Sequence, residues 1–295
     1  MSLNVLSLFD GISCARVALD RAGFSNINYS ASEVDSYAIQ VTKKNWAETK
    51  HLGDVRTVTK MDNLFLLIGG SPCQDLSVAK QGREGLDGLR SKLFFEYVRI
   101  LKESKPRYFI LENVASMSRA NRDKITEILG VEPILIDAAL VSAQSRERLF
   151  WTNIPVVGKP TDKGIAVKDI LQPKPLTVTK PFRSLPNKVK TSSGLVRAGH
   201  VGVPKVGTDG SLACHWWQNA RVYSSAGKAP TLGTCGKPIV KDGDCVRSLS
   251  PLECERLQGL PDNYTSCLSD SRRYHGIGNA FNVDVIAFIL SFIPK

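Results

Sequence analysis

Residues 4–33 read NVLSLFDGISCARVALDRAGFSNINYSASE, and this stretch decides the fold class. The apolar run at Asn4–Phe9 is typical of a buried strand, and Ser13–Ala22 has the pattern of a helix that ends at Gly23. A second strand is expected at Ile27–Glu33. A strand, a helix and a strand in close succession predict two parallel strands joined by a crossover helix.

The same alternation continues to about residue 155. Further strands are expected at Leu64–Ile68, Tyr108–Leu111, Ile134–Ile136 and Leu149–Trp151, with helices at Ser91–Lys102 and Asp123–Leu129. Between Pro155 and Val246, Gly, Pro, Ser, Thr and Lys are frequent and periodicity is weak. A helix follows at Ser250–Gln258, where Ser250 and Glu253 have the spacing of a capping box, and an apolar helix ends the chain at about Phe281–Phe292.

The last helix is too isolated to form a domain, so we expect it to return to the N-terminal sheet. Residues 1–155 plus 262–295 are therefore predicted to form one α/β domain, whose parallel sheet is covered by helices on both faces. Residues 156–261 are predicted to form a smaller, mixed and loop-rich domain inserted into it.

Composition narrows the possible functions. The chain has 295 residues, of which 42% are hydrophobic and 23% charged, as in an ordinary globular protein. Its longest apolar runs are too short to span a membrane, and its N-terminus lacks the features of a signal peptide. Ten basic and only two acidic residues lie between Lys159 and Gly207, within a net charge of +11. This excess fits either a solvated loop region or a surface that contacts nucleic-acid phosphates.

The seven cysteines point to free thiols. No two have Cys-x-x-Cys spacing, so no metal site is expected. An odd number in a chain of this length favours a reducing, cytoplasmic compartment, with most cysteines acting as small buried hydrophobes.

Polar residues follow several predicted strands, where ligands of an open α/β sheet bind. Gly11 allows a tight turn before a helix, Glu33 is placed to bind ribose hydroxyls, and Asp54 is placed to accept an amino proton from adenine. Each has a plain alternative: a strand-to-helix turn for Gly11, and a helix cap or solvated loop residue for the acids.

Three further groups follow the next strands. Cys73 lies on a turn in Gly70-Ser71-Pro72-Cys73-Gln74, Glu112 ends a strand, and Arg146 and Arg148 are two residues apart, hence on one face of an extended segment. Taken singly, Cys73 is better explained as a loop cysteine without a task. Glu112 has the alternative of an N-cap or a surface acid, and the two arginines that of a solvated edge.

Together the three groups match one reaction. A cysteine thiolate can add to C6 of cytosine if a carboxyl group hydrogen-bonded at N3 neutralises the developing charge and an arginine holds O2. The addition makes C5 nucleophilic, so that C5 can take a methyl group from a sulfonium donor. Loss of the C5 proton and of the cysteine restores the ring.

At this point the chain resembles the cytosine-C5 DNA methyltransferases. The resemblance covers nearly all of it in the family's motif order: Phe9-x-Gly11, Ser71-Pro72-Cys73-Gln74, Glu112-Asn113-Val114, Gln144-x-Arg146-x-Arg148, Arg247 to Gly259 and Gly278-Asn279-Ala280. Ser13 stands where many members have a glycine. The nucleophile motif is similar to the animal de novo branch, whereas the tail is similar to bacterial or phage members.

The resemblance implies S-adenosylmethionine as cofactor, a Rossmann-like sheet and no metal. The implied cofactor contacts are Phe9, Asp10, Gly11, Ile12, Ser13, Glu33, Val34, Asp54, Val55, Gly70, Leu93, Asn279 and Ala280. The implied catalytic residues are Ser71, Pro72, Cys73, Glu112, Gln144, Arg146 and Arg148. The implied DNA contacts are Gln74, Ser77, Asn113, Thr231 and Arg247.

It also implies double-stranded DNA as the partner. The inserted domain would recognise the target sequence, the cytosine would be flipped out of the duplex, and Val78–Arg90 would close over the DNA. Trp216 and Trp217 fit either a core or a DNA contact. The implied enzyme is a monomer in the cytoplasm of a bacterial or phage-infected cell, and a role in restriction–modification fits it.

Three alternatives remain at this stage. A transfer-RNA methyltransferase of the same chemistry is disfavoured by the large basic insertion. An amino-group methyltransferase is disfavoured because Pro72 is followed by Cys73 rather than by a second proline and an aromatic residue. A DNA-binding regulator without catalysis is disfavoured by the intact Cys73, Glu112, Arg146 and Arg148.

Overall fold

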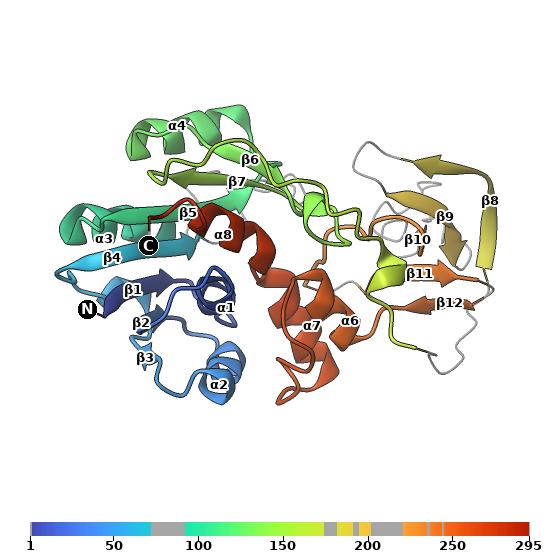
Figure 1. Cartoon of the computed structure of the whole chain (residues 1–295), viewed down its shortest axis with the longest axis horizontal. Helices are drawn as coiled ribbons and strands as arrows, with labels where there is room; N and C mark the ends of the chain where they lie inside the picture. The colour runs from blue at the N-terminus through green and yellow to red at the C-terminus, as the bar shows by residue number, and fades with distance from the viewer. Residues whose placement is uncertain are drawn as a thin grey trace, which may run out of the picture. The chain divides into compact units, whose positions relative to one another are not determined.

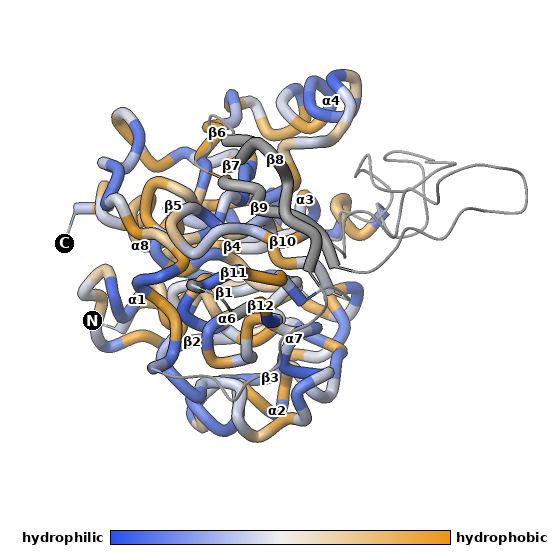
Figure 2. Tube along the Cα trace, turned by 90° about the vertical axis from the view of Figure 1, so that its right-hand side faces the viewer, coloured by the Kyte–Doolittle hydropathy of each residue, from blue (hydrophilic) through white to orange (hydrophobic). Residues whose placement is uncertain are grey.

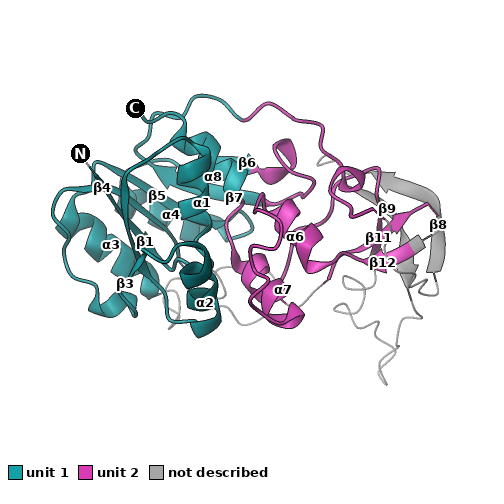
Figure 3. Ribbon diagram, turned by 60° about the horizontal axis from the view of Figure 1, so that its bottom comes forward, with its two compact units in different colours: residues 1–136, 147–159, 283–295 teal, residues 137–146, 160–282 magenta. Residues whose placement is uncertain are grey.

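A computed structural model describes residues 2–71, 92–173, 182–190, 195–201, 221–234, 237–243 and 245–294. Within it the chain forms two compact units (Figure 3). The first comprises residues 1–136, 147–159 and 283–295, and the second comprises residues 137–146 and 160–282. No helix in the described ranges is both long and apolar enough to cross a membrane.

The first unit is built on a sheet that has seven strands in the described residues. Their order is β3 (Lys50–His51), β2 (Ile27–Ser32), β1 (Leu3–Leu8), β4 (Leu64–Gly70), β5 (Tyr108–Val114), β7 (Glu147–Thr152) and β6 (Ile134–Asp137). The first five are mutually parallel, as expected from the sequence. The parallel prediction is wrong for β7, which is antiparallel to β5.

Helices cover both faces of this sheet (Figure 1). One side carries α3 (Leu93–Ser104) and α4 (Arg119–Leu129), and the other carries α1 (Cys14–Arg21), α2 (Ser36–Asn45) and the C-terminal α8 (Val283–Leu290). Helices α1 and α8 contact each other, so the end of the chain does return to the N-terminal sheet. Along α4, hydrophilic and hydrophobic residues alternate, and only Ile125 is buried (Figure 2).

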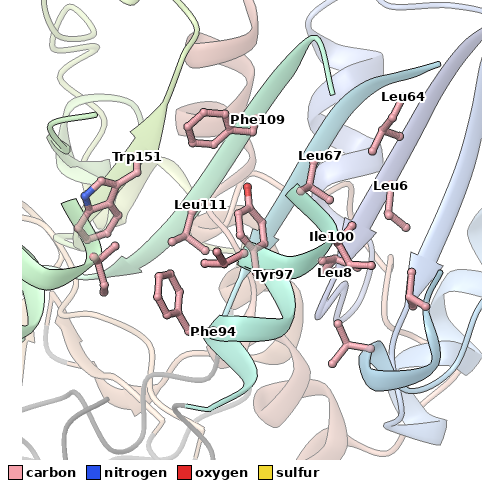
Figure 4. Packing of buried hydrophobic residues seen from close by; sticks show 14 of the residues in the cluster. Leu6, Leu8, Leu64, Leu67, Phe94, Tyr97, Ile100, Phe109, Leu111 and Trp151 are labelled. Atoms are coloured by element: carbon pink, nitrogen blue, oxygen red, sulfur yellow. The ribbon is translucent and has the colours of Figure 1, made fainter. Parts of the chain in front are cut away.

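Successive side chains of a strand point to opposite faces of the sheet, and this alternation decides which residues enter the hydrophobic core. In β1, Leu6 and Leu8 point to one face and pack with Leu67 and Leu111 against α3 (Figure 4). There is no space for a side chain at Gly69 near the end of β4. A Cβ on Gly69 would lie 2.9 Å from the Leu8 carbonyl oxygen and 3.2 Å from the Tyr97 ring. The close approach of these backbones therefore fixes the direction in which the chain leaves β4.

Tyr97 carries an unusual hydroxyl. Its side chain is fully buried, its hydroxyl has no hydrogen-bond partner among the described residues, and burial raises its pKa well above 10. A buried polar group without a partner loses its hydration and gains nothing in return. We therefore expect Tyr97→Phe to raise the free energy of unfolding by about 1 kcal/mol, measured as a shift in the urea midpoint.

Tyr274 provides the matched control, because its buried hydroxyl donates to the Leu249 carbonyl oxygen at 2.7 Å. Tyr274→Phe is expected to lower stability by about 1 kcal/mol. A loss of stability in Tyr97→Phe as large as that in Tyr274→Phe would mean that the Tyr97 hydroxyl has a partner.

The second unit carries a sheet that has five strands in the described residues. Their order is β12 (Cys245–Ser248), β11 (Ile239–Asp242), β10 (Arg221–Ser224), β9 (Val196–Val201) and β8 (Phe182–Lys190). Strands β10 and β11 are parallel and the other pairs are antiparallel. This unit also contains α6 (Pro251–Leu257), α7 (Asp270–Asn279) and the short turns η3 (Ala138–Leu140) and η4 (Val167–Asp169). The sequence indicated only a loop-rich region for these strands and did not indicate α2 or α7.

The division also differs from the expected boundaries at residues 155 and 262. Residues 137–146 belong with the second unit because its buried side chains hold them: Lys228 Nζ donates to the Ala139 and Ser142 carbonyl oxygens at 2.6 and 3.1 Å. The chain returns to the first unit only at Val283, since α7 contacts α6.

Candidate active site

The turn after β1 has an unusual backbone. Phe9, Gly11 and Ser13 all have positive φ, at 57°, 58° and 59°. Glycine adopts this left-handed conformation freely, whereas other residues lose about 1–2 kcal/mol in it. A Cβ on Gly11 would meet no atom within 4 Å, so this turn is open on the side that Gly11 faces.

Glu33, directly after β2, holds this turn. Its Oε2 accepts from the Gly11 N–H at 2.7 Å, and its Oε1 accepts from the N–H groups of Val34 and Asp35 at 2.7 and 2.8 Å. Beside it the Val34 side chain is 70% exposed. An acid and an exposed apolar side chain thus lie together at the carboxyl ends of β1 and β2, where nucleotide-like ligands bind.

Asp10 has a different position from the one expected of a cofactor contact. Its side chain is buried, with Oδ1 accepting from the Tyr29 hydroxyl at 2.6 Å and Oδ2 accepting from the Ser13 hydroxyl. Burial raises the pKa of Asp10 to about 6, although the hydrogen bonds from Ser13 and Tyr29 act in the opposite direction. Sequence reasoning missed Tyr29, which a period-two reading of β2 places on one face with Ala31.

Asp54 lies on the surface at the start of η1 (Val55–Thr57). Hydrogen bonds from the Arg56 side chain and backbone lower its pKa to about 2. The other expected cofactor contacts of the first unit differ in the exposure of their side chains. Ile12, Ser13 and Val55 have buried side chains, so only their backbones can reach a ligand, whereas Phe9, Gly70 and Leu93 are partly exposed.

Glu112 lies where β5 approaches its end, and it is held from β7. Its Oε1 forms an ion pair with Arg148 Nε at 2.8 Å, and both side chains are about 15% exposed. The register of β4 and β5 pairs Gly70 with Glu112, so the chain that continues toward Cys73 leaves β4 beside this carboxyl group.

Asn113, which was predicted to contact DNA, forms hydrogen bonds inside the protein. It is 1% exposed, and its Nδ2 donates to the Ser71 hydroxyl at 3.2 Å. Its Oδ1 accepts from the Val114 N–H at 2.8 Å. Both ends of the Asn113 amide are therefore engaged inside the protein. Asn113 ties the end of β5 to Ser71, which is buried and is the last described residue before Cys73.

Gln144 and Arg146, which were predicted to be catalytic, are both buried and belong to the second unit. Gln144 Oε1 accepts from the Leu232 N–H at 2.8 Å, and its Nε2 donates to Gln258 Oε1 at 3.2 Å. The Arg146 guanidinium donates to the carbonyl oxygens of Leu232, Gly278 and Ala280 at 3.0–3.2 Å.

The Gly278-Asn279-Ala280 segment is part of the same network. Gln258 Nε2 donates to the Ala280 carbonyl oxygen at 3.2 Å, and a Cβ on Gly278 would lie 2.5 Å from the Gly233 carbonyl oxygen. Asn279 is exposed, and its Nδ2 lies 3.3 Å from His275 Nε2. Ala280 is buried, so only its backbone is available to a ligand.

Thr231 and Arg247, expected to contact DNA, differ in exposure. Thr231 is exposed, and its hydroxyl donates to the Ser145 carbonyl oxygen at 2.7 Å. Arg247 is 6% exposed and makes a two-bond ion pair with Glu253, both at 2.7 Å. The guanidinium of Arg247 is thus buried against Glu253, and its contact with DNA stays a prediction.

Glu253 also confirms the expected capping box, since its Oε2 accepts from the Ser250 N–H at 2.8 Å. Burial raises its pKa, but the bonds from Arg247 and from the Gln172 and Ser250 backbones outweigh this, and the net pKa lies below its usual value.

A comparison with protein families decides the identity. Residues 3–295 match the family model of the C-5 cytosine-specific DNA methylases. The chain belongs to this family. It is a DNA (cytosine-5)-methyltransferase with the mixed α/β fold of S-adenosylmethionine-dependent methyltransferases.

Two relatives span nearly the whole methyltransferase. It is 30% identical to the type II methyltransferase M.HhaI of Haemophilus parahaemolyticus over 97% of this chain and 93% of the relative. It is 29% identical to the type II methyltransferase M.FnuDI of Fusobacterium nucleatum over 98% and 93%.

Solved structures show the same fold. The Entamoeba histolytica methyltransferase EhMeth aligns with a TM-score of 0.72 at 15% identity, covering 99% of this chain and 98% of that one. The S. pombe Dnmt2 methyltransferase aligns with a TM-score of 0.69 at 17% identity, covering 98% and 97%.

Several sites expected in the methyltransferase lie outside the described residues: Pro72, Cys73, Gln74, Ser77, the Val78–Arg90 loop, Trp216 and Trp217. Lys228 is a buried residue that sequence reasoning missed, because nothing in its Gly, Ala and Pro surroundings marks it. Its ammonium donates to three carbonyl groups, and burial lowers its pKa. The described residues contain no group of three or more His, Cys, Asp or Glu side chains that could hold a metal ion.

Proposed function

We propose that this methyltransferase works through a covalent bond between the Cys73 sulfur and C6 of the target cytosine, with Glu112 at N3. The observation that carries the proposal is the pairing of Gly70 with Glu112 across β4 and β5. Parallel strands end at the same edge of a sheet, so the chain leaves β4 toward Cys73 beside Glu112. The Asn113–Ser71 hydrogen bond supports this because it fastens Ser71, two residues before Cys73, to β5.

In the proposed reaction the Cys73 thiolate adds to C6, and the charge that develops on the ring is neutralised by Glu112 at N3. C5 then takes a methyl group, which S-adenosylmethionine, when bound, would supply as a sulfonium: its S–CH3 bond would break, the electron pair would stay on sulfur, and S-adenosylhomocysteine would leave. The C5 proton leaves to a base, and the C6–sulfur electron pair returns to Cys73, which restores the aromatic ring. Arg148 orients the Glu112 carboxyl group through their 2.8 Å contact.

The residues at the ends of β1 and β2 fit S-adenosylmethionine. Glu33 Oε2 accepts one bond among the described residues, and a carboxylate oxygen can accept two, which leaves capacity for a ribose hydroxyl. The exposed Val34 side chain provides an apolar contact for adenine. The Arg56 side chain is 70% exposed, so its ion pair with Asp54 is weak enough to yield to an adenine amino group. Within the first unit, Gly70 and Leu93 complete the proposed cofactor set.

We further propose that the second unit recognises the DNA sequence and that the first carries out catalysis on a flipped-out cytosine. In the second unit, Thr231 is exposed and available to DNA, whereas Gln144 and Arg146 hold the backbone of the unit through hydrogen bonds. Because the relatives M.HhaI and M.FnuDI are bacterial type II methyltransferases, we infer a monomeric enzyme of the cytoplasm with a role in restriction–modification.

The covalent step can be tested with wild-type enzyme. The protein is incubated with S-adenosylmethionine and a diverse duplex pool that contains 5-fluorocytosine, then digested and analysed by mass spectrometry. A fluorine at C5 cannot leave as a proton does, so we expect a stable adduct on the peptide that contains Cys73. The same pool made with ordinary cytosine should become methylated without an adduct. An adduct on another cysteine, or none with the fluorinated pool, would exclude Cys73 as the nucleophile.

A further inference from the structure

Ser13 has an uncommon conformation and an uncommon set of contacts. It is the residue before α1, with φ 59° and ψ 37°, yet its side chain makes no capping bond to that helix. Its hydroxyl bonds instead to the Asp10 carboxyl group and lies 2.8 Å from the Thr42 hydroxyl on α2. The side chain is fully buried, so it is directed into the protein.

Asp10 anchors these contacts to the sheet. Its backbone N–H donates to the Ser32 carbonyl oxygen of β2 at 3.1 Å, and its carbonyl oxygen accepts from the Ser13 N–H at 3.2 Å. Its carboxyl group receives hydroxyl hydrogens from Ser13 on one oxygen and from Tyr29 on the other. The carboxyl group is thus fixed from β2 and can fix Ser13 in turn.

The same turn is held from its other side. Gly11 lies between Asp10 and Ser13 in the turn, and its N–H donates to Glu33. Two carboxyl groups therefore accept hydrogen bonds from the same turn. Glu33 lies on its open side, where the cofactor is proposed to bind, and Asp10 lies on its buried side.

We propose that Asp10 is a positioning residue for S-adenosylmethionine binding: its carboxyl group holds Ser13 in the left-handed conformation and so keeps the Gly11 turn in its binding shape. The hydrogen bond to Ser13 thereby stabilises a backbone conformation that glycine would adopt at this position without support. The inference rests on the proposed cofactor site and adds a residue that acts from behind it. The raised pKa of Asp10 agrees with a carboxyl group committed to internal contacts.

The test is a double-mutant cycle with Asp10→Ala and Ser13→Gly, measured as the S-adenosylmethionine Kd by calorimetry and as KM and kcat for methyl transfer. With Ser13 present, Asp10→Ala should raise the Kd and KM about tenfold, while kcat at saturating cofactor changes little. In the Ser13→Gly background, Asp10→Ala should raise the Kd and KM less than about threefold, because glycine needs no support in this conformation.

Two further variants keep the test decisive if Asp10→Ala folds poorly. Ser13→Ala removes the hydroxyl but retains the Cβ, so it should bind the cofactor about tenfold more weakly than Ser13→Gly. Tyr29→Phe removes the other hydrogen bond to the same carboxyl group and should reduce stability while leaving the Kd within about twofold.

An equal effect of Asp10→Ala in both backgrounds, or equal Kd values for Ser13→Ala and Ser13→Gly, would overturn the proposal. A loss of kcat without a change in KM would also overturn it. If the wild-type protein itself fails to bind S-adenosylmethionine, the proposed cofactor site is wrong and the role of Asp10 falls with it.

Discussion

Replacement of Glu112 by glutamine is expected to slow methyl transfer by about 10²–10⁴-fold, the range that a positioned acid or base contributes. Glutamine has nearly the same shape, so its side-chain oxygen can still lie beside Arg148 Nε, as the Glu112 carboxyl group does at 2.8 Å. It cannot transfer a proton to N3, where negative charge develops when the thiolate adds to C6. The measurement is single-turnover transfer of a labelled methyl group to duplex DNA.

The matched control for Glu112→Gln is Glu103→Gln. Glu103 is a 42%-exposed acid near the end of α3 that pairs with Arg99 at 3.1 Å, so it offers the same chemical change away from the carboxyl edge of the sheet. Its transfer rate should match that of the wild type. A Glu112→Gln rate within about threefold of the wild type would remove Glu112 from the chemistry.

The second large effect concerns stability. Arg247→Met is expected to lower the free energy of unfolding by about 3–5 kcal/mol, because it leaves the buried Glu253 carboxylate without its cationic partner. Glu253 is only 1% exposed and cannot regain water in the folded state. Denaturant unfolding followed by circular dichroism measures the loss.

Two variants separate charge from packing. In Arg247→Met combined with Glu253→Gln, the uncompensated charge is gone and an oxygen remains for the backbone N–H groups, so stability should partly recover. Arg256→Met breaks an ion pair with Asp262 whose side chains are 31% and 46% exposed, and it should cost about 1 kcal/mol or less. Equal losses for Arg247→Met and Arg256→Met would show that burial of the Arg247 pair is unimportant.

The sequence predicted the first unit well because its signals are local. The apolar run of β1, the amphipathic α1 and Gly23, whose φ is 80°, all follow from neighbouring residues. The second unit was harder. Strand β8 contains Pro186, and α7 contains Gly276 and Gly278, so local propensity opposes elements that the rest of the fold nevertheless forms.

The site shows a similar limit. Glu33 and Glu112 lie at strand ends as expected, because strand ends can be located from the sequence. The motif around Asn113, Gln144 and Arg247 marked residues that matter, but a motif does not reveal whether a side chain faces a ligand or a buried carbonyl group. That distinction depends on segments distant in the chain, such as Leu232 and Leu257 for Gln144.

In the second unit, which we propose to recognise DNA, the contact between Gly278 and Gly233 has a consequence for engineering new specificity. With 2.5 Å between a hypothetical Cβ and the opposing carbonyl oxygen, two backbones touch with no side chain to absorb a misfit. A recognition segment transplanted from another enzyme must therefore carry a loop that matches Gly278 in its new host. A graft that ends before Thr231 keeps the native contact between the backbones of Gly233 and Gly278. A graft that includes Thr231–Gly233 replaces one side of this contact, and a substitution on the surface does not restore it.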